Sequence, residues 1–502
     1  MVQTLNFLLP SLYPNTLIDL SFPAPPLGLV PSIPEPIVQH LPIKYGKHQP
    51  VGRAKCMISN PPGPEDEQDQ VIVADDKFQV STIRLNPIRN SSEPENPETE
   101  ETIVPPTVIK QDVIKARSKD LWAGLVGVQG GAVSALTSGQ LTYHTTPSTS
   151  SSDGASDSSP SSSSSSRSIP SPIQCMTSTP LLPSSFVTAG KEVDVSIWDI
   201  ERTFGSSSSE GVSKTWDNGK RKKNVLEVGQ IWQAKNVPQN NLSLRQPINH
   251  LCLTYINGSP HHLVSGTKAG TIRRFDTRQR KPLSDWKVAR EGGVGCIASG
   301  VGHELFFSDQ SNLLASLDLR TGKILYTYSA MTATPSHLLP IPILGESVEK
   351  GGRRVGLGSI SSDATFRIHT STNPPPAQEE GSMKVKGNGN GVEGKKGEIL
   401  RVVGGVGVGQ GLYRGVGQRN IVPPRPLKTK TDADQGGAGE NEEEEEEVDE
   451  EELWQGMDEV KDQGKLPESE DDEEYSSDSD MGEEDRVVIR SKPKKKAKKI
   501  QP

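Results

Sequence analysis

Short apolar runs alternate with polar turns along the middle of this chain, and one such unit recurs. Six windows of about 13 residues share an apolar first position, a polar fifth position and an apolar twelfth position. They begin at Ile72, Leu125, Val187, Val264, Phe306 and Leu357. Three of them close with an aspartate, at Asp199, Asp276 and Asp318. A repeated β-hairpin is the simplest cause of this pattern.

The repeat predicts an all-β fold, a WD40-type β-propeller. The windows at Val264 and Phe306 start 42 residues apart, and a propeller blade of this type takes about 40–45 residues. Flanking runs at Ile248–Ile256 and Ile324–Tyr328 supply further strands. A single four-stranded sheet exposes two faces that only neighbouring sheets cover, so the blades are expected to close into a ring. Seven blades are expected, the seventh without an assigned location; a β-sandwich is the alternative.

Composition divides the chain into a folded part and additions. Of 502 residues only 32% are hydrophobic and 5% aromatic, beside 48 Gly and 40 Pro, which is low for a chain folded throughout. The propeller is predicted over residues 66–430, with insertions near 146–172, 204–225 and 373–397. Residues 1–65 are rich in proline and are assigned no fold. Residues 431–485 form an acidic tail predicted to be disordered, and residues 486–502 form a basic segment.

Charge is unevenly distributed around the net value of −9. The acidic tail outweighs a propeller region that is itself basic, a balance typical of proteins in nucleic-acid-rich surroundings. The densest basic stretch within the repeats is predicted to lie on one rim and to contact RNA phosphates or an acidic partner. Its residues are Arg273, Arg274, Arg278, Arg280, Lys281, Lys287 and Arg290. The alternative is a set of cations that solvate a sheet edge and deter edge-to-edge pairing.

Two short motifs stand out after the propeller region. Leu453 and Trp454 are apolar residues within the acidic run and predict a partner-binding motif, because they cannot form a core alone. The terminal lysines predict a nuclear or nucleolar targeting signal. They are Lys494, Lys495, Lys496, Lys498 and Lys499.

The residue pattern offers no catalytic constellation. Asp199, Asp276 and Asp318 recur at strand ends, so they are expected to stabilise turns rather than to act as acids or bases. The four cysteines, at 56, 175, 252 and 296, lack metal-ligand spacing and read as buried or free thiols. The glycine-rich run 404–411 lacks the Gly-Lys-Ser/Thr ending of a phosphate loop. We therefore expect no enzyme activity, no cofactor and no metal, and no membrane span.

Several short sequence motifs, in the order in which they occur, are more specific than those of a generic propeller. They are Leu121–Gly127, Ala189–Asp194, Gln233–Pro238, Ser265–Thr267, Arg273–Arg278, Gly404–Val408 and Glu452–Trp454. Over residues 70–460 the chain resembles the nucleolar WD-repeat family of 60S ribosome assembly factors, the fungal NSA-one type and its animal WD-repeat relatives.

That resemblance implies a seven-bladed, non-enzymatic scaffold that joins pre-60S particles in the nucleolus. Its implied partners are pre-rRNA, assembly proteins and a AAA ATPase that releases it. The alternative is a chromatin or histone-binding WD-repeat adaptor whose acidic tail binds basic histones.

Overall fold

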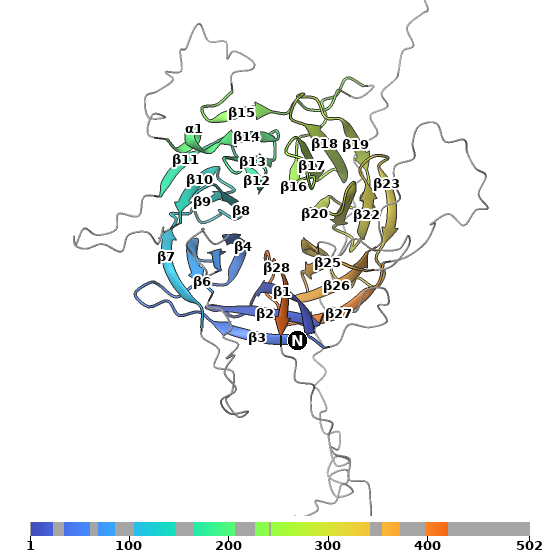
Figure 1. The fold of residues 1–502 in the computed structure, drawn as a ribbon. Helices are drawn as coiled ribbons and strands as arrows, with labels where there is room; N and C mark the ends of the chain where they lie inside the picture. The colour runs from blue at the N-terminus through green and yellow to red at the C-terminus, as the bar shows by residue number, and fades with distance from the viewer. Residues whose placement is uncertain are drawn as a thin grey trace, which may run out of the picture. The chain divides into compact units, whose positions relative to one another are not determined.

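The described residues build seven four-stranded antiparallel sheets, arranged radially about a central axis (Figure 1). The computed structural model describes residues 2–23, 35–60, 69–85, 105–146, 164–205, 226–239, 242–341, 354–371 and 397–419. The chain divides into two units, residues 1–423 and 424–502, and every described residue belongs to the first. The prediction of a seven-bladed β-propeller is confirmed.

Each sheet is a blade, numbered here in chain order and given from its inner to its outer strand. Blade 1 is β28 (Leu412–Arg419), β1 (Val2–Pro10), β2 (Thr16–Pro23) and β3 (Ile37–Pro42); blade 2 is β4 (Ala54–Asn60), β5 (Gln70–Asp75), β6 (Gln79–Arg84) and β7 (Thr107–Val113). Blade 3 is β8 (Trp122–Val128), β9 (Gly131–Leu136), β10 (Gln140–Thr145) and β11 (Ser165–Ser168); blade 4 is β12 (Ile173–Thr177), β13 (Ser185–Gly190), β14 (Ser196–Asp199) and β15 (Gln230–Gln233).

The remaining blades follow the same order. Blade 5 is β16 (His250–Tyr255), β17 (His262–Thr267), β18 (Thr271–Asp276) and β19 (Ser284–Lys287); blade 6 is β20 (Val294–Ser299), β21 (Glu304–Asp309), β22 (Leu314–Asp318) and β23 (Lys323–Thr327). Blade 7 is β24 (Pro335–Pro340), β25 (Arg354–Ser361), β26 (Thr365–Ser371) and β27 (Ile399–Gly404). In the described part of the chain the one helix is α1 (Ile200–Phe204), which Asp199 caps by accepting a hydrogen bond from the Arg202 amide.

Blade 1 joins the two ends of the folded chain and contains the hairpin that sequence reasoning did not locate. Strand β1 pairs with β2 on one side and with β28 on the other. The structure therefore differs from the expectation that residues 1–65 have no fold, because this range contributes β1 to β4. The prolines that suggested otherwise lie where strands end or turn: Pro10 ends β1, Pro14 is in the turn, and Pro23 ends β2.

The apolar core consists of seven clusters, one between each pair of neighbouring blades. The cluster between blades 5 and 6, for example, brings Val264 and Ile272 against Leu305 and Phe307, all fully buried. Blade 1 packs against blade 7 through Phe7, Phe22 and Phe366 in the same way. Because successive strand residues face opposite sides of a sheet, each blade contributes one set of side chains to the cluster on either side. Hydrophobic burial therefore holds the ring together all the way round.

Five of the six sequence windows coincide with the second and third strands of a blade. The window at Leu125 does not, because Leu125 lies on the inner strand β8 and the window's twelfth position, Leu136, lies on β9. In blade 3 the corresponding hairpin is β9–β10. The mismatch arises because β8 and β9 have the same apolar alternation and a Gly130-Gly131 turn of their own. Segment 146–172, expected to be an insertion, likewise contains β11.

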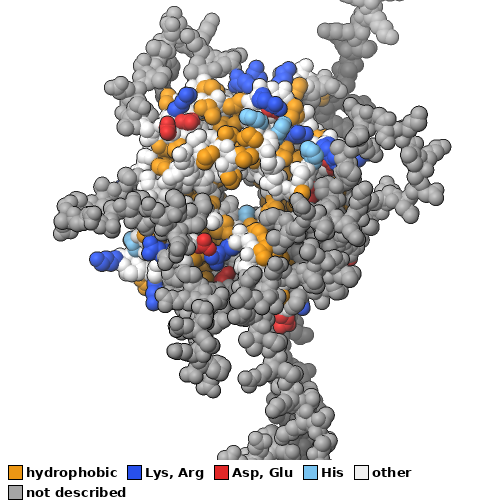
Figure 2. Space-filling view, viewed as in Figure 1, with side chains coloured by type: hydrophobic (Ala, Val, Ile, Leu, Met, Phe, Trp, Pro, Cys, Tyr) orange, Lys and Arg blue, Asp and Glu red, His pale blue; other side chains and the backbone are white. Residues whose placement is uncertain are grey.

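The two faces of the ring differ in their connections. First-to-second and third-to-fourth strand connections leave from one face, and the other connections leave from the opposite face. The longest connections, such as those joining β6 to β7, β10 to β11, β14 to β15 and β26 to β27, all leave from the first, which we call the long-connection face. We call the other the short-connection face. In Figure 2, viewed as in Figure 1, Lys and Arg side chains gather toward the margin of the ring, and hydrophobic side chains are more frequent around its centre.

The four cysteines occupy the same position on four inner strands, beside a β-bulge at the start of each. Three of the thiols lie next to the first carbonyl of the following inner strand: Cys175 Sγ is 3.7 Å from His250 O, Cys252 Sγ is 3.5 Å from Val294 O, and Cys296 Sγ is 3.4 Å from Pro335 O. Burial raises the pKa of Cys56 and Cys296 to about 12. These buried thiols stay protonated and fill a space that suits a small side chain.

Candidate nucleic-acid interface

The predicted basic stretch lies in blade 5, and we call its seven residues the β18 cluster. Arg273 and Arg274 are consecutive on β18, so their side chains leave opposite faces of the blade. Arg273 is only 4% exposed. Its Nε donates to Asp285 Oδ1 at 3.3 Å and its Nη1 to Asn236 Oδ1 at 3.4 Å. Contact of Arg273 with an RNA phosphate is therefore excluded by burial, which corrects the sequence-based assignment of this residue.

Three further members of the β18 cluster also bind within the chain. Arg274 Nη1 donates to Leu319 O of blade 6 at 3.2 Å, and Arg280 Nε donates to Gln233 O of blade 4 at 2.8 Å. Arg278 pairs with Asp276 through Nη2 and Oδ2 at 2.7 Å while its side chain stays 67% exposed. The contacts of Arg274 and Arg280 join blade 5 to both of its neighbours, so part of the cluster's charge holds the ring together.

The exposed members of the β18 cluster are divided between the two faces. Arg278 and Lys281 are exposed in the connection from β18 to β19, on the long-connection face. Arg290 is exposed in the connection from β19 to β20, on the short-connection face. Lys287 ends β19, and its ammonium donates to the Ala269 carbonyl. The sequence predicted that these residues share one rim of the ring. In the structure the exposed ones instead lie on two opposite faces.

The aspartates that close the repeats have the structural role predicted for them. Asp276 Oδ1 accepts from the Arg278 amide at 3.0 Å, and Asp318 Oδ1 accepts from the Arg320 amide at 2.9 Å. Each carboxylate also binds the guanidinium of the same arginine. The hydrogen bond from the Arg278 side chain lowers the pKa of Asp276 to about 2, against the opposing effect of burial. Both aspartates are thus turn-stabilising anions.

A second set of cations, not recognised in the sequence, lies on the short-connection face beside blade 2. These exposed residues, which we call the blade-2 patch, are Lys47, Lys77, Lys115, Arg117 and Lys119. They come from three connections: residues 43–53, 76–78 and 114–121. The three connections contain three, one and three Lys or Arg residues, so no dense run marks the patch in the sequence. The fold assembles it.

Contacts among the three connections hold this patch in place. Lys77 Nζ donates to Pro50 O at 3.2 Å, and the Gly52 amide donates to Asp75 Oδ2 at 2.6 Å. Trp122, which follows the third connection, donates from Nε1 to Asp75 O at 2.7 Å. Its ring packs against Phe78 with the ring centroids 5.5 Å apart. The cations therefore project from a hydrogen-bonded base.

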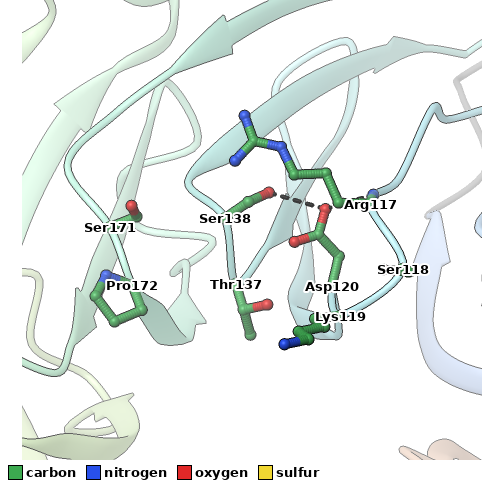
Figure 3. Close-up of a pocket in the computed structure, with 8 residues that line it drawn as sticks. All are labelled: Arg117, Ser118, Lys119, Asp120, Thr137, Ser138, Ser171 and Pro172. Carbon is green, nitrogen blue, oxygen red and sulfur yellow. Dashed lines mark hydrogen bonds between the residues drawn. The ribbon is translucent and has the colours of Figure 1, made fainter.

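A shallow hollow of about 450 Å³ borders the blade-2 patch (Figure 3). It is lined by Arg117, Ser118, Lys119, Asp120, Thr137, Ser138, Ser171 and Pro172. Asp120 is 8% exposed; its Oδ2 accepts from the Arg117 amide at 2.8 Å and from Ser138 Oγ at 3.1 Å. The side chains of Arg117 and Lys119 extend on opposite sides of Asp120 (Figure 3). The hollow thus presents cations and hydroxyls around a carboxylate that is already hydrogen-bonded.

A hydrogen-bonded Ser–His–Asp set that the sequence did not reveal joins blade 3, through Ser134 and His144, to Asp112 on β7 of blade 2. Ser134 Oγ is 2.9 Å from His144 Nε2, and His144 Nδ1 is 2.8 Å from Asp112 Oδ2. All three side chains are buried within and between the sheets. Burial alone would raise the pKa of Asp112, but the hydrogen bond and charges of His144 and Lys110 hold it below its usual range. Because no substrate atom reaches a group buried in a sheet, this set reads as an internal polar network.

The same pairing recurs in blade 7, where Ser359 Oγ lies 2.7 Å from His369 Nε2. Burial lowers the pKa of His369 to about 3. Arg367, two residues before His369, matches Arg273 of blade 5 in being buried and bound to an aspartate, here Asp363 at 2.6 Å. The recurrence supports a structural role for Arg273.

Within the described ranges, no group of three or more His, Cys, Asp or Glu side chains is placed to hold a metal ion. No helix among the described residues is long and apolar enough to cross a membrane.

Comparison with known proteins adds one informative match. No family model matches the chain. The chain is similar to the ribosome biogenesis protein NSA1 of the yeast Meyerozyma guilliermondii, with 27% identity over 199 residues. The match covers 38% of this chain and 45% of that relative. It confirms the resemblance inferred from the sequence, over less than half the length of either protein.

The motifs of the second unit lie outside the described residues. These are the Leu453–Trp454 motif and the lysines at 494, 495, 496, 498 and 499. The acidic tail and the basic segment that contain them also remain predictions.

Proposed function

We propose that this chain is a non-enzymatic assembly factor in the biogenesis of the large ribosomal subunit, and that it binds pre-60S particles through a basic propeller surface. The observation that carries the proposal is the similarity to a ribosome biogenesis protein, NSA1. A ring of seven blades held by seven apolar clusters is compatible with it, because such a ring holds its connecting loops in fixed positions where partners can bind them.

Binding in this proposal depends on shape and charge. The exposed members of the β18 cluster, such as Arg278 and Lys281, supply contacts from the long-connection face to phosphates or to acidic assembly proteins. Arg273 and Arg274 act indirectly by joining blade 5 to its neighbours. The buried Ser134–His144–Asp112 set takes no part in chemistry.

The proposal extends to partners and location. Pre-rRNA and pre-60S proteins are the binding partners, and a AAA ATPase releases the factor. The terminal lysines direct the chain to the nucleus and nucleolus, and Leu453 with Trp454 binds an assembly protein.

Sedimentation tests the proposed function directly. The full-length chain, expressed with a tag in a eukaryotic cell, is expected to co-sediment with large-subunit precursors in a sucrose gradient. Arg278→Glu with Lys281→Glu should shift it toward free fractions, because both side chains are exposed. Lys323→Glu with Arg202→Glu, two exposed cations elsewhere, is the matched control. Sedimentation of the wild-type chain with nucleosomes instead would favour the histone-binding alternative.

A further inference from the structure

The hollow lies at blade 3 on the short-connection face, between its connections to blades 2 and 4, and it combines features that the proposed function does not use. It is lined by two exposed cations, Arg117 and Lys119, and by hydroxyls of Thr137, Ser138 and Ser171. Ser and Thr hydroxyls with Lys and Arg side chains are the groups that most often contact nucleic-acid phosphates.

The cations at the hollow are available for an external ligand. Among the described residues, neither Arg117 nor Lys119 forms an ion pair. The nearest acid, Asp120, is buried and accepts from the Arg117 amide and from Ser138 Oγ. Its hydrogen bonds therefore fix the loop and leave the guanidinium and ammonium groups to project outward.

The arrangement suits a chain of phosphates better than a single anion. Arg117 and Lys119 extend to opposite sides of Asp120 (Figure 3), so they do not converge on one point. Lys115 and Lys77 continue the positive charge across the short-connection face of blade 2. A linear polyanion that crosses from blade 2 to blade 3 meets these cations one after another.

None of the residues that line the hollow is aromatic, so the hollow itself has no ring on which a base could stack. Trp122 is the aromatic residue nearest to the hollow in sequence, and it is turned inward, with Nε1 bonded to Asp75 O and its ring packed against Phe78. Single-stranded sequence readout relies on exposed aromatic platforms. Contact with the sugar–phosphate backbone does not require them.

We propose that the short-connection face of blades 2 and 3 binds the phosphodiester backbone of structured RNA, with Arg117 and Lys119 on separate phosphates and Ser171 donating a hydrogen bond beside them. The proposal rests on the proposed function for the origin of that RNA. It adds a second surface, on the face opposite to Arg278 and Lys281.

The experiment measures affinity for RNA as a function of salt. A fluorescently labelled 20-base-pair RNA duplex of mixed sequence is titrated with the full-length chain at several KCl concentrations between 50 and 300 mM. Each phosphate contact contributes about 1 to the slope of log affinity against log salt. Arg117→Gln with Lys119→Gln is expected to reduce the slope by about 2 and the affinity at 100 mM by about 10- to 100-fold.

Two further variants test whether the loss of RNA affinity is specific to Arg117 and Lys119. Arg202→Gln with Lys323→Gln removes the same charge from other blades, where both side chains are exposed, and should change affinity less than about twofold. Leu121 borders the loop and is 68% exposed. Leu121→Ser should leave RNA affinity unchanged, whereas an apolar anchor for a protein partner would be lost.

The outcomes separate this proposal from the proposed function. Wild-type slope and affinity in the Arg117/Lys119 variant, an equal loss in the Arg202/Lys323 variant, or no duplex binding by the wild-type chain would each overturn the RNA site. If the wild-type chain still sediments with large-subunit precursors, the proposed function stands without it. If Leu121→Ser, and not the Arg117/Lys119 variant, releases the chain from precursors, the face binds a protein instead.

Discussion

The β18 cluster and the blade-2 patch are both made of Lys and Arg residues, but they differ in exposure. Three arginines of the β18 cluster bind groups within the protein, whereas the cations of the blade-2 patch are exposed. In the β18 cluster Arg273, Arg274 and Arg280 bind groups of neighbouring strands and blades. In the blade-2 patch Arg117 and Lys119 project from a turn and are exposed. Arginines on a strand bind other groups of the protein, whereas Lys and Arg residues in several connections together form an exposed basic surface.

The difference follows from propeller geometry. Both faces of every blade pack against another blade, so consecutive strand residues such as Arg273 and Arg274 both point toward protein. Residues in connections between strands escape this burial. A search for binding cations in a propeller is therefore better directed at its connections than at its strands.

The largest expected loss of stability comes from substitution of Arg273. Arg273→Glu replaces a buried cation with an anion beside Asp285 and Asn236, and we expect the free energy of unfolding to fall by about 3–5 kcal/mol. Urea denaturation followed by tryptophan fluorescence measures the change. Lys281→Glu is the exposed control and should stay within about 0.5 kcal/mol of wild type. Equal stability of both variants would mean that Arg273 is not held as described.

Three histidines in blades 5 and 7 should also make the protein sensitive to acid. Burial, assisted by the charge of Arg273, lowers the pKa of His250 to about 3. Burial lowers the pKa of His337 to about 4 and that of His369 to about 3. The unfolded chain binds these protons near pH 6.5 and the folded chain does not, so the contribution of these histidines to stability is complete above pH 6.5 and is lost as the pH falls toward 3 to 4.

The measurement is the slope of the unfolding free energy between pH 6 and 5. Each buried histidine contributes up to about 1.4 kcal/mol per pH unit. His250→Gln should reduce the slope by about that amount. An unchanged slope would place a proton on His250 in the folded state.

A smaller effect is expected at the exposed end of the β18 cluster. Arg278→Ala removes the guanidinium that binds Asp276, so the pKa of Asp276 should rise from about 2 toward its ordinary value of about 4. Carboxyl chemical shifts in an NMR titration report this change. Lys281→Ala, which leaves the pair intact, should not move it.

The smallest effect on stability is expected in the blade-2 patch. Arg117→Gln with Lys119→Gln should leave the free energy of unfolding within about 0.5 kcal/mol of wild type, because both side chains are exposed. Thermal unfolding checks this. A clear loss of stability would show that these cations have partners in the fold, and the contrast with the β18 cluster would disappear.

The sequence predicted the propeller because most second and third strands repeat one alternation, as at Val264–Asp276. It could not reveal blade 1, since β1 and β28 pair across almost the whole folded chain and no local pattern encodes that pairing. The window at Leu125 was out of phase because first and second strands can show the same alternation. The sites were less predictable still: burial of Arg273 depends on Asn236 and Asp285, and the blade-2 patch depends on loops brought together by the ring.

The pairing of β1 with β28 also has a consequence for synthesis on the translating ribosome. Strand β1 ends at Pro10, and β28 begins only at Leu412. At roughly 5–20 residues per second, about 400 residues take on the order of 20–80 s to emerge. During that time the edge of the β1–β2 hairpin that β28 later occupies lacks its permanent partner, an aggregation risk. A chaperone that covers this edge during translation would be of direct use to the nascent chain.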